Sequence, residues 1–240
     1  MDQVNSIDSV ERVVLTSSVV AINGDNQDMI DKGIDRLNEE HWNTTSSLKH
    51  APYSFSKTVA EKKAWDLQKK QERWDLVVIN PGFVMGPSLS GRTDGQSTQF
   101  MMDLLLGKMA AGAPELTFGY VDVRDIAKAH ILAMKQSNCK GRYIVTENSY
   151  SVLEVASFID KAFPGQFKLP KRTLPKWLMY VFGPLMGMSW KMVRRNIGLP
   201  LTYDHSKSVD DLGLRYRNIS ETFSDHANQL MDMNLVKRPE

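Results

Sequence analysis

The sequence predicts an α/β protein in which a parallel sheet is covered by helices on both faces. Three short apolar runs, at residues 12–16, 76–80 and 142–146, have the length and the β-branched composition of buried strands. Between them, residues 54–71 and 123–135 place apolar side chains at helical spacing. Strands that alternate with helices of this length form βαβ units, so we expect a doubly wound parallel sheet.

The other segments continue this alternation. Residues 99–109 and 152–163 have helical patterns, and residues 116–120 form a short extended piece. Residues 23–52 are predicted to be a long polar loop that contains a single helical turn.

Composition indicates an ordinary globular protein. Of the 240 residues 42% are hydrophobic and 24% are charged, and a net charge of +2 gives no electrostatic reason to expect a nucleic-acid partner. Cys139 is the only cysteine and the five histidines lack metal-ligand spacing, so we expect neither a disulfide nor a metal site. Residues 1–14 are polar and charged, unlike a secretory signal, and we predict a cytoplasmic protein.

One apolar segment allows two interpretations. Residues 177–190 are rich in aromatic side chains and are flanked by Lys and Arg on both sides. The run is shorter than the ~18 residues of a membrane-spanning helix, and Gly183-Pro184 interrupts it. It is therefore either a lid or pocket helix over an apolar site, or a segment that contacts a membrane surface.

Three polar features fall where ligands bind parallel sheets, beyond the carboxyl ends of the strands. Ser18 follows the strand at 12–16. Tyr53 and Lys57 begin the next helix, and side chains four residues apart lie on one face about 6 Å from each other. A sharp turn at residues 80–87, with the sequence NPGFVMGP, ends the strand at 76–80 and can present backbone polar groups.

These residue types suit the reduction of a carbonyl group. Hydride delivery to the carbonyl carbon builds negative charge on the oxygen, which then needs a proton donor and a hydrogen-bond donor. A free tyrosine has a pKa of about 10, and a lysine ammonium one helical turn away lowers that value. Tyr53 is thus the predicted general acid, Lys57 its activating charge, and Ser18 the hydrogen-bond donor to the substrate oxygen.

The ordered motifs resemble the extended short-chain dehydrogenase/reductases of the NAD-dependent epimerase/dehydratase superfamily, and in particular their dihydroflavonol reductase and cinnamoyl-CoA reductase-like branch. The likeness rests on the TSS strand end, YxxxK, NPGFVMGP, the YVDVRDIAKAH pattern at 120–130 and GRY at 141–143. The order of the motifs matches over essentially the whole chain.

The resemblance implies a Rossmann-type catalytic region over residues 1–150 and a smaller, mostly helical substrate-binding or lid region over 151–240, interleaved with the first. It implies that Ser18, Tyr53 and Lys57 are the catalytic residues of an oxidoreductase acting on a fairly apolar small-molecule carbonyl or alcohol. It also implies NAD(P) as cofactor. The residues expected to contact that cofactor are Tyr53, Lys57, Pro81, Gly82, Phe83 and Val84.

The sequence departs from this family in one respect. Such enzymes begin with a strand, a GxxGxxG turn and a helix that hold the pyrophosphate, and no such motif occurs here. We therefore expect a chain that lacks the first strands of the fold, that binds NAD(P) weakly by itself and whose open sheet edge favours a homo-oligomer. The alternative is a non-catalytic binding or interaction protein that has lost its cofactor.

Overall fold

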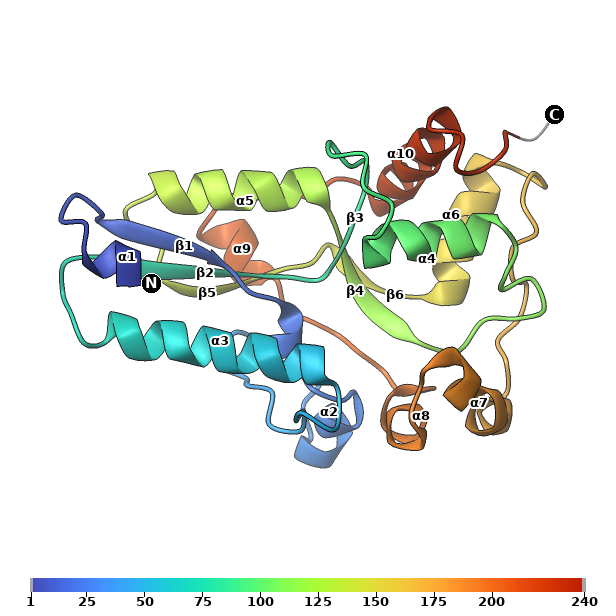
Figure 1. Cartoon of the computed structure of the whole chain (residues 1–240), viewed down its shortest axis with the longest axis horizontal. Coiled ribbons are helices and arrows are strands. Elements are labelled where there is room, and N and C mark those ends of the chain that lie inside the picture. The colour runs from blue at the N-terminus through green and yellow to red at the C-terminus, as the bar shows by residue number, and fades with distance from the viewer. Residues whose placement is uncertain (1, 239–240) are drawn as a thin grey trace. The chain divides into compact units, whose positions relative to one another are not determined.

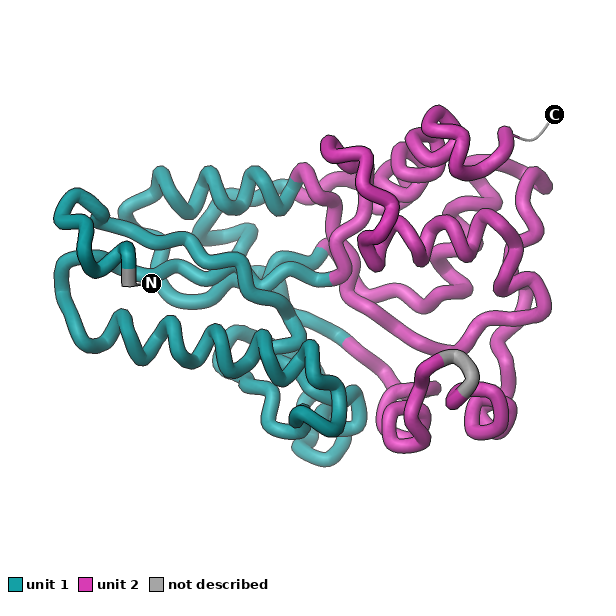
Figure 2. The backbone as a smooth tube through the Cα atoms, viewed as in Figure 1, with its two compact units in different colours: residues 1–82, 125–146, 202–215 teal, residues 83–124, 147–201, 216–240 magenta. Residues whose placement is uncertain are grey.

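The computed structural model describes residues 2–238, and the chain forms two compact units (Figure 2). Unit 1 consists of residues 1–82, 125–146 and 202–215. Unit 2 consists of residues 83–124, 147–201 and 216–240. The chain therefore passes between the units several times, and each unit combines segments that are distant in the sequence.

Unit 1 is built on a parallel sheet of three strands in the order β1-β2-β5. These are β1 (Arg12–Thr16), β2 (Asp75–Pro81) and β5 (Gly141–Val145), the three strands that the apolar runs predict. The central strand β2 is almost wholly buried, because its side chains are covered on both faces. The α/β fold with a parallel sheet is thus confirmed.

Two long helices lie on opposite sides of this sheet (Figure 1). They are α3 (Pro52–Gln68) and α5 (Val123–Lys135). Hydrogen bonds fix α5 to the first strand, because Thr16 Oγ1 lies 2.7 Å from His130 Nε2 and Arg12 Nη1 donates to the Ala133 carbonyl at 2.9 Å. The shorter helical segments of unit 1 are α1 (Asp2–Asn5), η1 (Val19–Ala21), α2 (Gln27–Lys32) and α9 (Ser206–Asp210).

The two edges of the sheet differ. Side chains close the edge at β5, where Glu39 Oε1 accepts the Ile144 N–H at 2.9 Å and Lys207 Nζ donates to the Arg142 carbonyl at 2.9 Å. Side chains bound in this way keep the edge strand β5 from pairing with other chains. At the other edge, β1 pairs only with β2 among the described residues.

Unit 2 contains a second sheet of three strands, β3 (Phe83–Met85), β4 (Thr117–Asp122) and β6 (Asn148–Ser151). The pairing of β3 with β4 is parallel, whereas β4 and β6 are antiparallel. The helices α4 (Gln96–Leu105), α6 (Val152–Ala162) and α10 (Ile219–Asp232) pack with this sheet around one apolar core.

Aromatic rings fill the centre of the unit 2 core. The Tyr120 ring is fully buried, and its centroid lies 5.5 Å from that of Phe223 in an edge-to-face arrangement. Phe223 also stacks on Phe158 of α6 at 6.2 Å. Such ring pairs add to the stabilisation that comes from apolar burial, so this core ties α6 and α10 to β4.

Several elements differ from the sequence-based expectation. The extended piece at 116–120 is β4 and belongs to the second sheet, whereas the helical turn expected in the polar loop is present as α2. Helix α3 begins two residues earlier and ends three residues earlier than predicted, and α4 occupies 96–105. The strand β6 and the helix α10 were not predicted, although Ile219, Phe223, Ala227 and Leu230 repeat at helical spacing and are all buried.

A buried histidine gives unit 2 a predictable dependence on pH. His226 of α10 accepts the Gly86 N–H through Nδ1, and burial lowers the pKa of the imidazole to about 4 despite the nearby Asp122 carboxylate. In the unfolded chain a histidine titrates at about 6.5. As pH falls below that value the unfolded state binds a proton that the native state does not, so the free energy of unfolding decreases.

We predict that His226 accounts for a loss of about 2 kcal/mol in the free energy of unfolding between pH 7 and pH 4.5. Guanidinium titrations of the wild-type protein and of His226→Gln at several pH values isolate this contribution, because other titrating groups are common to both. The stability advantage of the wild type should shrink steadily as pH falls. An advantage that stays constant over this range would show that His226 is not held neutral by burial.

Candidate active site

Ser18 lies two residues after the last residue of β1, at the carboxyl end of the parallel sheet of unit 1. It is the N-cap of η1, and its Oγ accepts the Val20 N–H at 3.3 Å. Its backbone carbonyl accepts a hydrogen bond of 3.1 Å from Asn80 Nδ2. The backbone of Ser18 is therefore fixed to β2, and its hydroxyl lies at the edge of the sheet where ligands of α/β proteins bind.

Tyr53 and Lys57 lie in the first two turns of α3. The chain enters this helix through Ala51 in the left-handed region (φ 52°), and Pro52 occupies the first helical position, where its missing N–H is not needed. Tyr53 is 55% exposed and Lys57 is half-buried. Among residues 2–238, neither the Tyr53 hydroxyl nor the Lys57 ammonium has a hydrogen-bond partner.

The structure places these residues on neighbouring elements. Helix α3 packs along η1, the segment that Ser18 caps. Thr58 of α3 is buried there, and its Oγ1 donates to the Ser54 carbonyl at 2.7 Å. The turn after β1 and the start of α3 thus meet in one region of unit 1.

A buried carboxylate holds α3 against the sheet. Glu61 lies one helical turn beyond Lys57 and is only 1% exposed. Its Oε1 accepts from Arg142 Nε of β5 at 2.6 Å, and its Oε2 accepts from Asn80 Nδ2 of β2 at 2.8 Å and from the Ser17 hydroxyl. Donors from β2, from β5 and from the residue that follows β1 therefore meet on one carboxylate of the helix.

The guanidinium of Arg142 is fixed on its other side by the loop before α3. Its Nη1 donates to the carbonyls of Glu39 and His41 at 2.9 and 2.6 Å, and the Trp42 ring lies 3.8 Å from its central carbon. Burial lowers the pKa of Arg142, and the neighbouring Glu61 carboxylate opposes this effect. A buried ion pair with this many hydrogen bonds defines one geometry for the segments that it joins.

The turn after β2 marks a boundary between the units. Pro81 ends β2, and the Gly82 N–H donates to the Val145 carbonyl of β5 at 3.1 Å. Phe83 and Val84 belong to β3 in unit 2, where they pair with Tyr120 and Val121. Of the four residues predicted to contact a cofactor in this turn, two therefore lie in unit 1 and two in unit 2.

Glu61 was not singled out from the sequence, although it continues the spacing of Tyr53 and Lys57 by another four residues. An acidic side chain on a helix rich in Lys and Glu usually faces solvent. Arg142 appeared only as part of the GRY motif. Their pairing depends on the parallel register of β2 and β5, which sets Asn80 opposite Ile144 and Arg142 opposite Val78.

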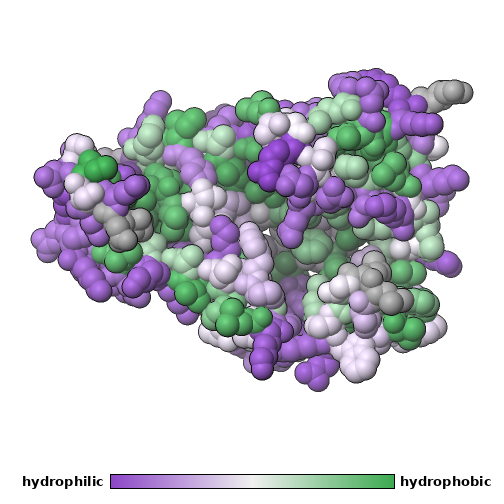
Figure 3. Space-filling model, in the orientation of Figure 1, coloured by the Kyte–Doolittle hydropathy of each residue, from purple (hydrophilic) through white to green (hydrophobic). Residues whose placement is uncertain are grey.

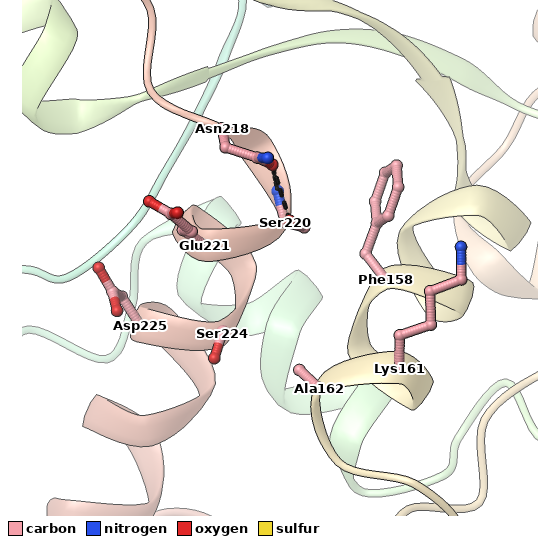
Figure 4. A pocket seen from close by; sticks show the side chains of 8 residues that line it. All are labelled: Phe158, Lys161, Ala162, Asn218, Ser220, Glu221, Ser224 and Asp225. Atoms are coloured by element: carbon pink, nitrogen blue, oxygen red, sulfur yellow. Dashed lines mark hydrogen bonds between the residues drawn. The ribbon is translucent and has the colours of Figure 1, made fainter.

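A cavity in unit 2 lies apart from the predicted residues. It has a volume of about 520 Å³ and lies between α6 and α10 (Figure 4). Lys161 stands on one wall, and Glu221 and Asp225 on the other wall extend away from it (Figure 4). The charged groups do not converge on one point, so this cavity does not have the arrangement of a catalytic site. Within residues 2–238, no cluster of His, Cys, Asp and Glu is placed to hold a metal ion.

Comparison with known proteins gives a consistent result. The sequence model described as the NAD dependent epimerase/dehydratase family matches residues 4–145. NADPH-dependent methylglyoxal reductase GRE2 of Saccharomyces cerevisiae is 33% identical over 237 residues, which cover 93% of this chain and 64% of the relative. Cinnamoyl-CoA reductase 1 of Arabidopsis thaliana is 30% identical over 229 residues, covering 93% and 58%.

Solved structures share the fold. The crystal structure of yeast methylglyoxal/isovaleraldehyde reductase Gre2 complexed with NADPH has a TM-score of 0.67 and 28% identity, covering 94% of this chain and 65% of that one. Vestitone reductase from alfalfa (Medicago sativa) has a TM-score of 0.69 at 22% identity, covering 95% and 66%, and supports the fold alone. The chain spans less than two thirds of the length of the two curated relatives. It belongs to the NAD dependent epimerase/dehydratase family, in the branch that includes the cinnamoyl-CoA reductases.

Proposed function

We propose that the protein is an NAD(P)-dependent oxidoreductase that reduces the carbonyl group of a fairly apolar small molecule. The observation that carries the proposal is the arrangement in unit 1, where Ser18 at the end of β1 and the Tyr53–Lys57 pair on α3 occupy adjoining elements. Both functional groups of the pair are without hydrogen-bond partners among the described residues, and so are free to address a ligand.

In the proposed reaction each residue has one role. The Tyr53 hydroxyl donates a proton to the carbonyl oxygen as hydride reaches the carbon, and the Lys57 ammonium favours the phenolate that remains. The Ser18 hydroxyl donates a hydrogen bond to the same oxygen and stabilises its developing charge. The bound nicotinamide cofactor supplies the hydride.

Glu61 has a positioning role in this proposal. It lies on α3 one turn after Lys57 and is bonded to Ser17, the neighbour of Ser18. The same carboxylate therefore connects the helix that carries Tyr53 and Lys57 to the strand end that carries Ser18. A displacement of about 1 Å between reacting groups can reduce a rate by about a hundredfold. By fixing α3 relative to the end of β1, Glu61 prevents such a displacement in this proposal.

The relatives suggest the cofactor and the substrate class. The yeast relative is named an NADPH-dependent methylglyoxal reductase, and the Arabidopsis relative a cinnamoyl-CoA reductase. We propose that Lys57 bonds the nicotinamide ribose, that the backbone at Pro81, Gly82, Phe83 and Val84 faces the nicotinamide amide, and that residues 151–240 supply the substrate-binding region. Tyr53 would touch both the cofactor and the substrate.

A second function is favoured by one observation. The 240 residues contain no GxxGxxG motif, which supplies most of the anchoring of a dinucleotide in this fold. A protein with this sequence could instead bind a small molecule or another chain without catalysis. Cofactor binding and turnover, measured separately, distinguish the two functions.

Calorimetric titration of the 240-residue chain should give a Kd for NADPH and NADH weaker than ~1 mM, or about −4 kcal/mol. The reason is that Lys57 and the Pro81 turn reach only the nicotinamide end of the cofactor in our proposal. A micromolar Kd would contradict this expectation and would mean that the chain holds the pyrophosphate by another route.

The catalytic assignment is tested by Tyr53→Phe in a chimera in which the GxxGxxG segment of a family member precedes Met1. Oxidation of NADPH is followed over a range of substrate concentrations, with methylglyoxal and cinnamoyl-CoA as probe substrates. The variant should lose about 10²–10⁴ in kcat while its cofactor affinity changes little. The matched control is Lys63→Gln, which alters an exposed residue further along α3 and outside the proposed site, and should leave kcat unchanged.

Retention of more than about half of the wild-type kcat by Tyr53→Phe would overturn the role of this residue as proton donor. Absence of turnover in the chimera with all substrates, together with normal cofactor binding, would favour the non-catalytic alternative.

A further inference from the structure

Unit 2 contains a segment with an extreme charge distribution. Residues 161–203 include no Asp or Glu, whereas the whole chain has 30 basic and 28 acidic residues. The rest of the chain is consequently net negative. The basic residues of this segment are Lys161, Lys168, Lys171, Arg172, Lys176, Lys191, Arg194 and Arg195.

The centre of this segment is a helical hairpin, formed by α7 (Lys176–Phe182), η2 (Gly183–Met186) and α8 (Trp190–Asn196). We call residues 176–196 the α7–α8 hairpin. One side of it is anchored, since Met179, Val193 and Ile197 are buried in a cluster with Ala113 and Val152.

The other side of the hairpin exposes large apolar side chains. Trp177 is 65% exposed and Trp190 is 67% exposed, and Val181 and Phe182 each expose more than half of their surface. Figure 3 has the orientation of Figure 1, and at the position of α7 and α8 it shows hydrophobic residues beside residues of intermediate hydropathy. Exposed aromatic clusters of this size on a folded element mark interaction surfaces.

Hydrogen bonds hold this surface in place. The Trp190 indole N–H donates to the Tyr180 carbonyl at 3.1 Å, which links α8 to α7. Lys176 Nζ donates to the carbonyls of Arg194 and Ile197, so the first residue of α7 closes the end of α8. The aromatic side chains are thus presented by a connected hairpin and not by a frayed end.

We propose that the α7–α8 hairpin binds the surface of an anionic membrane. Tryptophan is the side chain that concentrates at the boundary between lipid headgroups and acyl chains, because its ring is apolar and its N–H is polar. Apolar area inserted at that boundary, combined with flanking Lys and Arg that meet acidic headgroups, is the physical basis of peripheral binding. No helix in the described part of the chain is long and apolar enough to cross a membrane.

Two other occupants fit these observations less well. A second copy of the chain would bring two sets of basic side chains together, and like charges on both sides of an interface oppose association. A nucleic acid would satisfy the cations, but its phosphates offer no apolar environment to Val181 and Phe182. An anionic bilayer satisfies both the charge and the exposed apolar area.

Sedimentation with lipid vesicles tests the proposal on the 240-residue chain. The wild-type protein should bind vesicles that contain about 30% phosphatidylserine in phosphatidylcholine, and bind pure phosphatidylcholine vesicles at least about tenfold more weakly. Raising the salt from roughly 0.1 to 0.5 M should weaken the binding to anionic vesicles, because the cations are at the surface.

Two double variants separate the apolar from the electrostatic contribution. Trp177→Ser/Phe182→Ser and Lys191→Gln/Arg194→Gln should each lower the partition coefficient on anionic vesicles by about tenfold or more. The matched controls are Ile131→Ser/Met134→Ser, which removes exposed apolar side chains of unit 1, and Lys63→Gln/Lys70→Gln, which removes exposed charges there. Both controls should bind as the wild type does, and circular dichroism checks that all variants are folded.

Three results would overturn the proposal. The first is equal binding to neutral and anionic vesicles, or no binding to either. The second is a hairpin variant that is folded and binds like the wild type. The third is that both hairpin variants lose a concentration-dependent dimer, or lose tight binding to a short RNA, but still bind vesicles. That result would assign the exposed surface of the hairpin to another partner.

Discussion

The buried contact between Glu61 and Arg142 is the constraint on which the candidate site depends. A carboxylate of α3 accepts hydrogen bonds from side chains of β5, of β2 and of the turn after β1, and the guanidinium that it binds is fixed by the loop at residues 39–42. Removal of either charge would leave the other buried and uncompensated, which costs about 3–5 kcal/mol. The position of α3 is therefore set by polar contacts of defined geometry as well as by apolar packing.

This constraint explains how a solvent-exposed residue can have a precise position. Tyr53 is about half-exposed, yet it lies two turns before Glu61 on a continuous helix. The opposite end of the contact, Ser17, precedes Ser18 directly. A rigid base beneath an open surface is the arrangement that binding and catalytic groups require, since the reacting side chains must be free to meet a ligand while their backbone is fixed.

The sequence predicted what depends on local pattern and missed what depends on tertiary contact. The strands of unit 1 were found because short β-branched runs are distinctive, whereas β6, with the sequence NSYS, is too short and polar to be recognised. Helix α10 is an exception, because Ile219, Phe223, Ala227 and Leu230 repeat at helical spacing and this local pattern was not used; packing against Tyr120 and Phe158 shows the face that it buries. The role of Glu61 could not be predicted from the local sequence, because its burial and its partners depend on the register of β2 and β5. The motif residues Ser18, Tyr53 and Lys57 could be named in advance, but their support could not.

A double-mutant cycle on Glu61 and Arg142 tests whether this ion pair holds α3 against the sheet. The free energies of unfolding of the wild type, Glu61→Leu, Arg142→Leu and the double variant are measured at neutral pH by guanidinium titration followed by far-UV circular dichroism. Each single variant should lose about 3–5 kcal/mol, and the double variant should lose less than the sum of the two by about 1–3 kcal/mol. Additive losses, or single variants as stable as the wild type, would show that this ion pair does not hold α3 against the sheet.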